Sequence, residues 1–217
     1  MHKAPVTIVG FGDSITEAVI RTPDPENRWL NILSGQLSEA FPGRDFRVIN
    51  AGVGGNSARE AMARFDKEVS GHHPDWVLLE FGGNNDDATN PERLVLPEEF
   101  RWHLDDFRRR LSSHTRVLVI TFPPVIDEQH AWSSNPYYRQ FGGIDASVER
   151  FRNITREFAA ANGFPLVDLY RELKRRMTAK TRNRYTRTDG VHLTVAGNRL
   201  LAKMVFGAVR KLALPVA

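Results

Sequence analysis

Short runs of β-branched and other apolar residues alternate with longer stretches in which apolar positions recur at helical spacing. The short runs predict strands at Val6 to Gly10, Phe46 to Asn50, Trp76 to Phe81, Arg116 to Thr121 and Pro165 to Asp168. The longer stretches predict helices at Arg28 to Ala40, Ser57 to Val69, Pro97 to Leu111, Asp145 to Ala161 and Thr194 to Leu212. Strands that alternate with helices are typical of a parallel sheet covered on both faces. The pattern therefore predicts an α/β fold, a three-layer α/β/α sandwich around a five-stranded parallel sheet.

Two segments interrupt this alternation. Asp127 to Gly143 is a connection rich in aromatic residues and longer than most loops, which indicates a functional role. Arg171 to Arg187 holds eight basic residues and a single acidic one, Glu172. Neither segment resembles a linker, and no shift in composition divides the chain. We therefore expect residues 1–217 to form a single domain.

Composition excludes several classes of protein. Of the 217 residues, 41% are hydrophobic and 26% charged, which is typical of a globular chain and not of a disordered one. The longest apolar runs span a handful of residues, far short of the ~20 that a membrane-spanning helix needs. The absence of cysteine excludes disulfides, thiolate metal sites and a cysteine nucleophile.

The start of the chain and its net charge give weaker indications. The apolar run that precedes Gly12 is too short for the core of a signal peptide, so we expect a cytoplasmic protein, although a trimmed secreted chain would start in the same way. The net charge of +4 rests on the basic segment Arg171 to Arg187. Nucleic-acid binding would require further basic patches with interleaved aromatic residues, so we expect no nucleic-acid partner. The segment is either a solvated surface or a field that steers anionic substrates.

The candidate chemistry lies where predicted strands end, because ligands of open parallel sheets bind beyond the carboxyl ends of the strands. The first strand is followed by Gly12-Asp13-Ser14. The glycine permits a tight turn after which the Ser14 hydroxyl stands exposed beside its own backbone N–H, as a nucleophile requires. The alternative is that Asp13 or Ser14 only caps a short helix.

Glycine-rich loops follow the second and third strands. They read Gly52-Val53-Gly54-Gly55-Asn56-Ser57 and Gly82-Gly83-Asn84-Asn85-Asp86. Neither has the spacing of a dinucleotide fingerprint or of a phosphate-binding P-loop. Each is either a plain tight turn or a place where backbone N–H groups and an asparagine amide approach a developing negative oxygen.

Asp189 and His192 stand three residues apart just before the last predicted helix. At this spacing a carboxylate can bind imidazole Nδ1 and leave Nε2 free to take a proton from a hydroxyl group. The pair is also compatible with a local hydrogen bond or with half of a metal site. A metal site is the weaker alternative, because no third ligand is spaced to join His192.

Taken in this order, the four motifs resemble the SGNH hydrolase (GDSL esterase/lipase) family over nearly the whole chain. The resemblance implies a flavodoxin-like fold, in agreement with the predicted strands. It implies that Ser14 is the nucleophile, that His192 is its general base and that Asp189 orients the imidazole. It also implies an oxyanion hole made by the backbone N–H groups of Ser14 and Gly55 and the side-chain amide of Asn84.

The third motif departs from the family pattern. The family usually has Gly-x-Asn-Asp, whereas Gly82-Gly83-Asn84 is followed here by Asn85. An alternative register, starting at Gly83, would make Asn85 the amide donor. We prefer Asn84, because Phe81 and Gly82 then occupy their expected places.

The resemblance implies a serine ester hydrolase that needs no metal or organic cofactor. Its substrates would be small-molecule or carbohydrate esters with short acyl groups, with acetyl groups on carbohydrates as one class, cleaved through an acyl-enzyme on Ser14. The same triad would serve an acyltransferase that uses an alcohol instead of water. A third alternative is a flavodoxin-like module that binds a ligand without catalysis.

Overall fold

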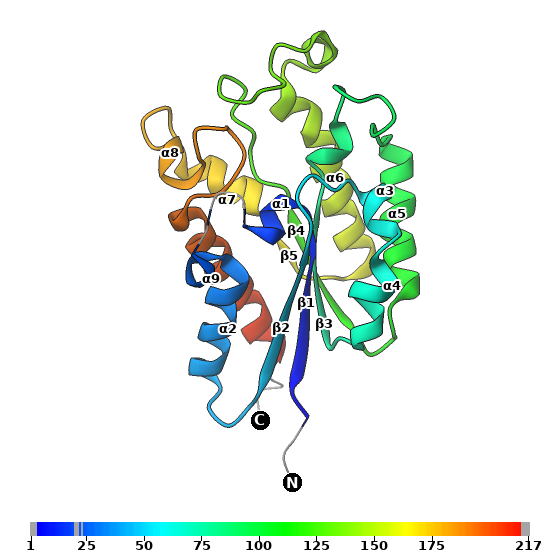
Figure 1. Ribbon diagram of the computed structural model, residues 1–217, viewed down its shortest axis with the longest axis vertical. Helices are drawn as coiled ribbons and strands as arrows, with labels where there is room; N and C mark the ends of the chain where they lie inside the picture. The colour runs from blue at the N-terminus through cyan, green and yellow to red at the C-terminus, as the bar shows by residue number, and fades with distance from the viewer. Residues whose placement is uncertain (1–3, 20–21, 23, 214–217) are drawn as a thin grey trace.

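The computed structural model describes residues 4–19, 22 and 24–213. Its strands form one parallel sheet in the order β2-β1-β3-β4-β5 (Figure 1). The strands are β1 (Val6–Gly12), β2 (Phe46–Gly52), β3 (Trp76–Phe81), β4 (Arg116–Thr121) and β5 (Leu166–Val167). This is the strand order of flavodoxin-like folds. The predicted five-stranded parallel sheet is therefore confirmed.

Helices cover both faces of the sheet (Figure 1). One face packs against α2 (Trp29–Ala40), α7 (Leu169–Arg176) and α9 (Val195–Ala213). The other packs against α3 (Ala58–Met62), α4 (Phe65–Glu68), α5 (Pro97–Arg110) and α6 (Ile144–Asn162). The remaining short elements are α1 (Ser14–Glu17), α8 (Arg182–Tyr185), η1 (Pro25–Asn27), η2 (Ser70–His72), η3 (Asn84–Asp86) and η4 (Pro136–Phe141). The predicted three-layer sandwich is thus confirmed.

Alternate residues of the central strands feed two separate cores. Ile8 and Leu78 point to the side of α2 and α9, and Val9 and Leu79 point to the opposite side. Every residue of β3 is buried, as expected for a strand with a neighbour on each side and helices on both faces. On the second side Phe11 makes edge-to-face contacts with three other phenylalanines, Phe65, Phe81 and Phe107.

Three predicted strands differ in extent. β1 and β2 each continue two residues beyond the prediction, because their glycine-rich ends still pair across the sheet. β5 has only two residues, because Asp168 turns away to cap α7 by accepting the Arg171 N–H at 3.0 Å. The helix α7 was not predicted. Most of its residues are charged, and its two buried leucines, Leu169 and Leu173, are too few to give a clear helical pattern.

The single helix predicted from Ser57 to Val69 is wrong. The chain forms α3 and α4 with a break at Ala63 and Arg64, where the Arg64 N–H bonds three residues back to Ala61. The break lets the Arg64 guanidinium reach the ends of two strands, donating to Gly12 O at 2.8 Å and Ala51 O at 2.6 Å. No helix within the described residues is both long and apolar enough to cross a lipid bilayer.

A fully buried arginine fixes the segment that follows β4. Arg152 of α6 is 0% exposed and donates to the carbonyl oxygens of Phe122 and Pro123 at 3.1 and 2.8 Å. It also pairs with Asp145 at 2.7 Å. Removal of one partner of a buried ion pair is strongly destabilising, because the other charged group is then left buried without its partner. Arg152 therefore ties the end of β4 to α6.

We expect Arg152→Met to lower the free energy of unfolding by about 3–5 kcal/mol, because it breaks the ion pair with Asp145 and removes the donor of the Phe122 and Pro123 carbonyl groups. Urea unfolding followed by circular dichroism measures the change. Arg101→Met is the matched control, because Arg101 pairs with Glu157 on the surface at 50% side-chain exposure. That pair should contribute less than about 1 kcal/mol. Equal losses in the two variants would contradict the role assigned to Arg152.

Candidate active site

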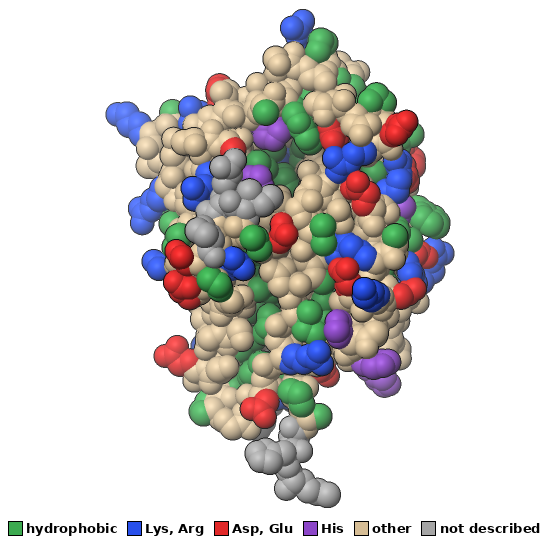
Figure 2. Space-filling view, viewed as in Figure 1, with side chains coloured by type: hydrophobic (Ala, Val, Ile, Leu, Met, Phe, Trp, Pro, Cys, Tyr) green, Lys and Arg blue, Asp and Glu red, His purple; other side chains and the backbone are tan. Residues whose placement is uncertain are grey.

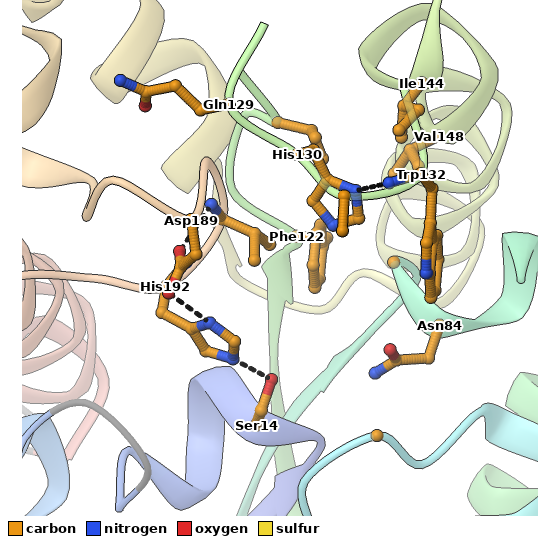
Figure 3. Close-up of a pocket in the computed structure, with 15 residues that line it drawn as sticks. Ser14, Asn84, Phe122, Gln129, His130, Trp132, Ile144, Val148, Asp189 and His192 are labelled. Carbon is orange, nitrogen blue, oxygen red and sulfur yellow. Dashed lines mark hydrogen bonds and ion pairs between the residues drawn. The ribbon is translucent and has the colours of Figure 1, made fainter. Parts of the chain in front are cut away.

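Ser14 is the first residue of α1, directly after the end of β1. The Asp13 side chain caps this helix, with Oδ1 accepting the Ile15 N–H at 2.9 Å. The cap is thus made by Asp13 and not by Ser14, so the two alternative interpretations of Gly12-Asp13-Ser14 do not compete. The Ser14 side chain remains free to face the cavity described below (Figure 3).

The structure brings Ser14, His192 and Asp189 together from opposite ends of the chain. His192 Nε2 lies 3.0 Å from Ser14 Oγ, and His192 Nδ1 lies 3.1 Å from Asp189 Oδ2 (Figure 3). Both Asp189 and His192 belong to the loop before α9. With the proton on Nδ1 held by Asp189, the lone pair of Nε2 faces the Ser14 hydroxyl. This is the geometry in which an imidazole can take a proton from a serine.

Backbone donors keep Asp189 in place. Its Oδ1 accepts the N–H groups of Val191 at 3.1 Å and His192 at 3.0 Å. Partial burial acts to raise the pKa of Asp189, but these N–H groups and then the imidazole outweigh it and lower that pKa. Asp189 is therefore an ionised acceptor beside His192 at neutral pH.

The predicted oxyanion donors lie on the loops after β2 and β3. Gly55 has a φ of +79°, a left-handed conformation that favours glycine. Within the described residues, neither the Ser14 N–H nor the Gly55 N–H donates to a backbone acceptor. Asn84 Nδ2 donates to Asp13 Oδ2 at 3.1 Å and to Asn56 O at 3.3 Å. Because both partners are acceptors, they fix which end of the amide is the nitrogen.

Asn85, the alternative donor, lies elsewhere. It is fully buried, and its Oδ1 accepts the Ala58 N–H at the start of α3 at 2.8 Å. This is a helix-capping contact that an aspartate could also make, so the departure from the family motif leaves the fold of the loop intact. Asn84, and not Asn85, faces the cavity.

The site opens into a cavity of about 410 Å3. Ser14, Gly55, Asn84, Asp189 and His192 lie along it together with Gly83, Phe122, Val125, Gln129, His130, Ala131, Trp132, Ile144, Val148 and Val191. Figure 2 shows the hollow with histidine and apolar side chains at its edge. Among the described residues, no group of three or more His, Asp or Glu side chains is arranged to hold a metal ion.

The long aromatic connection forms one wall of this cavity. Figure 3 shows the Trp132 indole extending into it from the segment above. The other aromatic residues of the connection serve to anchor it; the Tyr138 hydroxyl, for example, donates to Asp86 O at 2.6 Å. Sequence reasoning did not single out His130, which also lines the cavity and whose Nδ1 accepts the Trp132 N–H at 3.2 Å. Burial lowers the pKa of His130. Its place inside a long, aromatic connection was the one available signal.

Arg93 joins the two loops that carry Gly55 and Asn84. Its guanidinium donates to Gly55 O and to Asp87 Oδ2, the latter at 3.0 Å. A third contact, to Glu60 at 3.1 Å, connects it to α3. The two loops are therefore held relative to each other without the participation of a substrate.

The basic segment Arg171 to Arg187 contributes no lysine or arginine to the residues that line the cavity. Several of its basic residues form ion pairs with acidic neighbours, among them Arg171, Lys174, Arg175, Arg176 and Arg182. These pairs favour the interpretation of the segment as a solvated surface over that of a field that steers anionic substrates.

Comparison with known proteins decides the family. The sequence profile of the GDSL-like lipase/acylhydrolase family matches residues 11–200. This chain belongs to the GDSL-like lipase/acylhydrolase family. The resemblance expected from the sequence is thereby confirmed, and this GDSL-like hydrolase is a carboxylic ester hydrolase.

Individual relatives match most of its length, and solved structures share its fold. The GDSL-like hydrolase is 25% identical over 211 residues to an acetylxylan esterase of Geobacillus stearothermophilus, covering 89% of each chain. It is 26% identical over 213 residues to the lipoprotein YqeF of Bacillus subtilis, covering 89% of this chain and 85% of YqeF. The crystal structure of a lipase/acylhydrolase from Enterococcus faecalis has the same fold, with a TM-score of 0.75, 23% identity and coverage of 95% and 96% of the two chains. The cytoplasmic location stays a prediction from the sequence.

We expect a fluorophosphonate to label this GDSL-like hydrolase at Ser14, because His192 lies in position to activate its hydroxyl. Mass spectrometry of the digested adduct locates the label. His192→Ala should slow labelling by a factor of about 100 or more. Ser57 is the internal control, because it is buried in the capping box of α3. Label on Ser57 or on another serine would show that the nucleophile is assigned wrongly.

Proposed function

We propose that this protein hydrolyses esters of short acyl groups, acetyl groups on carbohydrates foremost, through an acyl-enzyme on Ser14. The observation that carries the proposal is the chain of contacts from Ser14 to His192 to Asp189 beside the cavity, with steps of 3.0 and 3.1 Å. A non-catalytic binding module has no need for a serine hydroxyl aligned in this way.

The first half of the reaction acylates the serine. His192 Nε2 takes the Ser14 proton while Oγ attacks the ester carbonyl, and the resulting imidazolium gives its proton to the leaving alcohol. Asp189 holds the imidazole in the required tautomer and stabilises its positive charge. In the second half, water replaces the alcohol, repeats the same proton transfers and releases the carboxylic acid.

Three donors would receive the negative oxygen of each tetrahedral intermediate. They are the backbone N–H groups of Ser14 and Gly55 and the side-chain amide of Asn84. A single donor of this kind is typically worth about 3 kcal/mol of transition-state stabilisation. The donors stand preorganised, because Arg93 fixes the two loops and Asp13 fixes the amide.

The shape of the cavity favours a small acyl group. Its volume of about 410 Å3 is near the lower end of the ~300–1,000 Å3 of small-molecule sites. The Phe122 ring lies so close to Gly83 that a methyl group at Gly83 would be 2.1 Å from it. The Phe122 ring therefore fills the space next to Gly83 and limits the cavity on this side. The Trp132 indole supplies the flat aromatic surface that a sugar ring needs, and the acetylxylan esterase relative supports a carbohydrate ester.

A panel of esters tests the proposal. We expect turnover of 4-nitrophenyl acetate and acetylated xylo-oligosaccharides, a loss of at least about tenfold in kcat/KM from acetate to octanoate, and no effect of chelators. Trp132→Ala should raise KM for the oligosaccharide about tenfold and leave KM for 4-nitrophenyl acetate within twofold. Trp102→Ala is the matched control, because this tryptophan is 53% exposed on α5 and does not line the cavity.

The outcomes separate the alternatives. A preference for long acyl chains would contradict the short-acyl proposal. An acyl product formed with an added alcohol faster than with water would identify an acyltransferase. Activity that disappears with a chelator would contradict the metal-free mechanism.

Asn84→Ala should mainly affect catalysis, whereas Asn85→Ala should mainly affect stability. We expect Asn84→Ala to lower kcat by about a hundredfold or more with little change in KM, because its bond forms mainly in the transition state. Asn85→Ala should instead lower the melting temperature, because it leaves the buried Ala58 N–H in the first turn of α3 without its acceptor, and should reduce kcat far less. Steady-state kinetics and thermal unfolding of both variants provide the comparison. A larger loss of kcat in Asn85→Ala would assign the donor to Asn85.

A further inference from the structure

A second acid lies beneath the nucleophile and takes no part in the proton transfers described above. Glu80 is on β3, four residues before Asn84, and it is 0% exposed. The carboxyl group of Asp13 is also 0% exposed, and the two acids lie close enough that each affects the pKa of the other. Neither carboxyl group forms an ion pair with a described Lys, Arg or His. Two carboxylates buried side by side cannot both ionise without a large desolvation and repulsion cost, so the pair retains a proton.

The contacts indicate which atom holds that proton. Thr16 Oγ1 donates to Glu80 Oε2 at 3.0 Å. Glu80 Oε1 is buried and receives no donor from the described residues. The two oxygens of Asp13 accept the Ile15 N–H and Asn84 Nδ2 at 2.9 and 3.1 Å. Asp13 is thus the acceptor of the pair, and Oε1 of Glu80 is the atom left to carry the proton.

The electrostatics point in the same direction. Burial, and then the charge of Asp13, raises the pKa of Glu80 well above its usual range. Burial also raises the pKa of Asp13, to about 7, while the Ile15 N–H, Glu80, Asn84 and Arg64 act to lower it. Arg64 is the charged group that faces the pair, from the break between α3 and α4, and it is engaged with Gly12 O and Ala51 O. Glu80 is therefore the last of the two acids to ionise.

Gly12 makes this arrangement possible. A Cβ at Gly12 would lie 2.1 Å from Thr16 Oγ1 and 2.5 Å from Glu80 O. Only a residue without a side chain leaves room for the Thr16 hydroxyl to reach the Glu80 carboxyl group. The glycine of the first motif thus serves the buried acid pair as well as the turn.

We propose that Glu80 is a positioning residue: its carboxyl group carries a proton shared with Asp13, and the pair holds the side-chain amide of Asn84 in place for the oxyanion. The inference rests on the proposed function, since it assigns Asn84 to the oxyanion hole. The bond from Asn84 to Asn56 O is the longer of its two bonds, so that N–H turns to the oxyanion while the bond to Asp13 remains. The proton on Glu80 also keeps a second negative charge away from the place where the oxyanion forms.

Two substitutions at Glu80 test whether its hydrogen-bonding contacts, and not a negative charge, are what catalysis requires. Glu80→Gln keeps a neutral group that donates to Asp13 and accepts from Thr16, so its kcat should remain within about threefold of the wild type. Glu80→Leu removes both contacts and should lower kcat at least about tenfold, with KM within about twofold. Thr121→Val is the control, because Thr121 is a buried residue at the end of the neighbouring strand β4 and bonds to Asp168 instead. Its kcat should stay within about twofold.

A double-mutant cycle asks whether Glu80 acts through Asn84. If it does, Glu80→Leu combined with Asn84→Ala should be no slower than Asn84→Ala alone, within about threefold. Losses that multiply would overturn the positioning role. The role would equally be overturned if Glu80→Gln lost as much kcat as Glu80→Leu.

The shared proton can also be detected without an activity assay, from the pH dependence of protein stability. The pKa of Glu80 is raised in the folded state, so the native protein holds a proton that the unfolded chain releases above pH ~4.3, and stability falls as pH rises. Above pH ~5, and until Glu80 itself ionises in the folded state, the unfolding constant of the wild type should rise more steeply with pH than that of Glu80→Gln, by up to about tenfold per pH unit. Urea unfolding across this range measures both slopes.

Parallel slopes would show that Glu80 holds no proton and would overturn the proposal, whatever the kinetics. Failure of the proposed function gives a different result, namely an unlabelled Ser14 and an inactive ester panel while the two slopes still differ. If Glu80→Leu does not fold, the Glu80→Gln slope and its kcat decide the matter.

Discussion

The loops that carry Ser14, Gly55 and Asn84 start at the same level because β1, β2 and β3 run parallel in one fixed register. Gly12 is aligned with Gly52 on one side and with Glu80 on the other. A slip of one residue between β1 and β3 would turn the Glu80 side chain to the opposite face of the sheet and remove it from Asp13. The relative height of the strands is thus the constraint on which the donors, the buried acids and the nucleophile all depend.

The second half of the site, Asp189 and His192, comes from the loop before α9, far along the chain from Ser14. Trp29 of α2 connects the two halves, because its backbone N–H donates to Asn198 of α9 at 3.2 Å and its indole donates to Ile15 O of α1 at 3.0 Å. The helix that carries Ser14 and the helix that follows His192 are thereby both fixed to one buried residue, Trp29. The separation of 178 residues between the two reacting groups is bridged by packing and not by the chain itself.

Periodicity was sufficient for the fold, because it arises from local sequence. The principal site residues were predicted from the order of the four motifs and from the family that this order resembles. Ser14, Asn84 and the Asp189 to His192 pair each lie at the end of a strongly patterned element, where short-range rules apply. The role of Glu80 was not predicted, because Glu80 lies within an apolar strand. Its position beside Asp13 depends on the pairing of β3 with β1, which the sequence does not show. The break in the helix predicted from Ser57 to Val69 has the same origin, since Arg64 bonds to carbonyl groups of two other strands.

The floor and the wall of the cavity have different origins in the chain. Ser14, Gly55, Asn84 and His192 come from four separate loops, each tied to the sheet or to a neighbouring loop, whereas Gln129 to Trp132 form one continuous stretch of the connection after β4. An exchange of that single connection would alter what the cavity accepts and leave Ser14, Gly55 and Asn84 on other segments. It would have to keep the contact with Gly190, between Asp189 and His192. The substrate range can therefore evolve, or be engineered, through changes in the connection after β4 while the loops that carry the reacting groups stay the same.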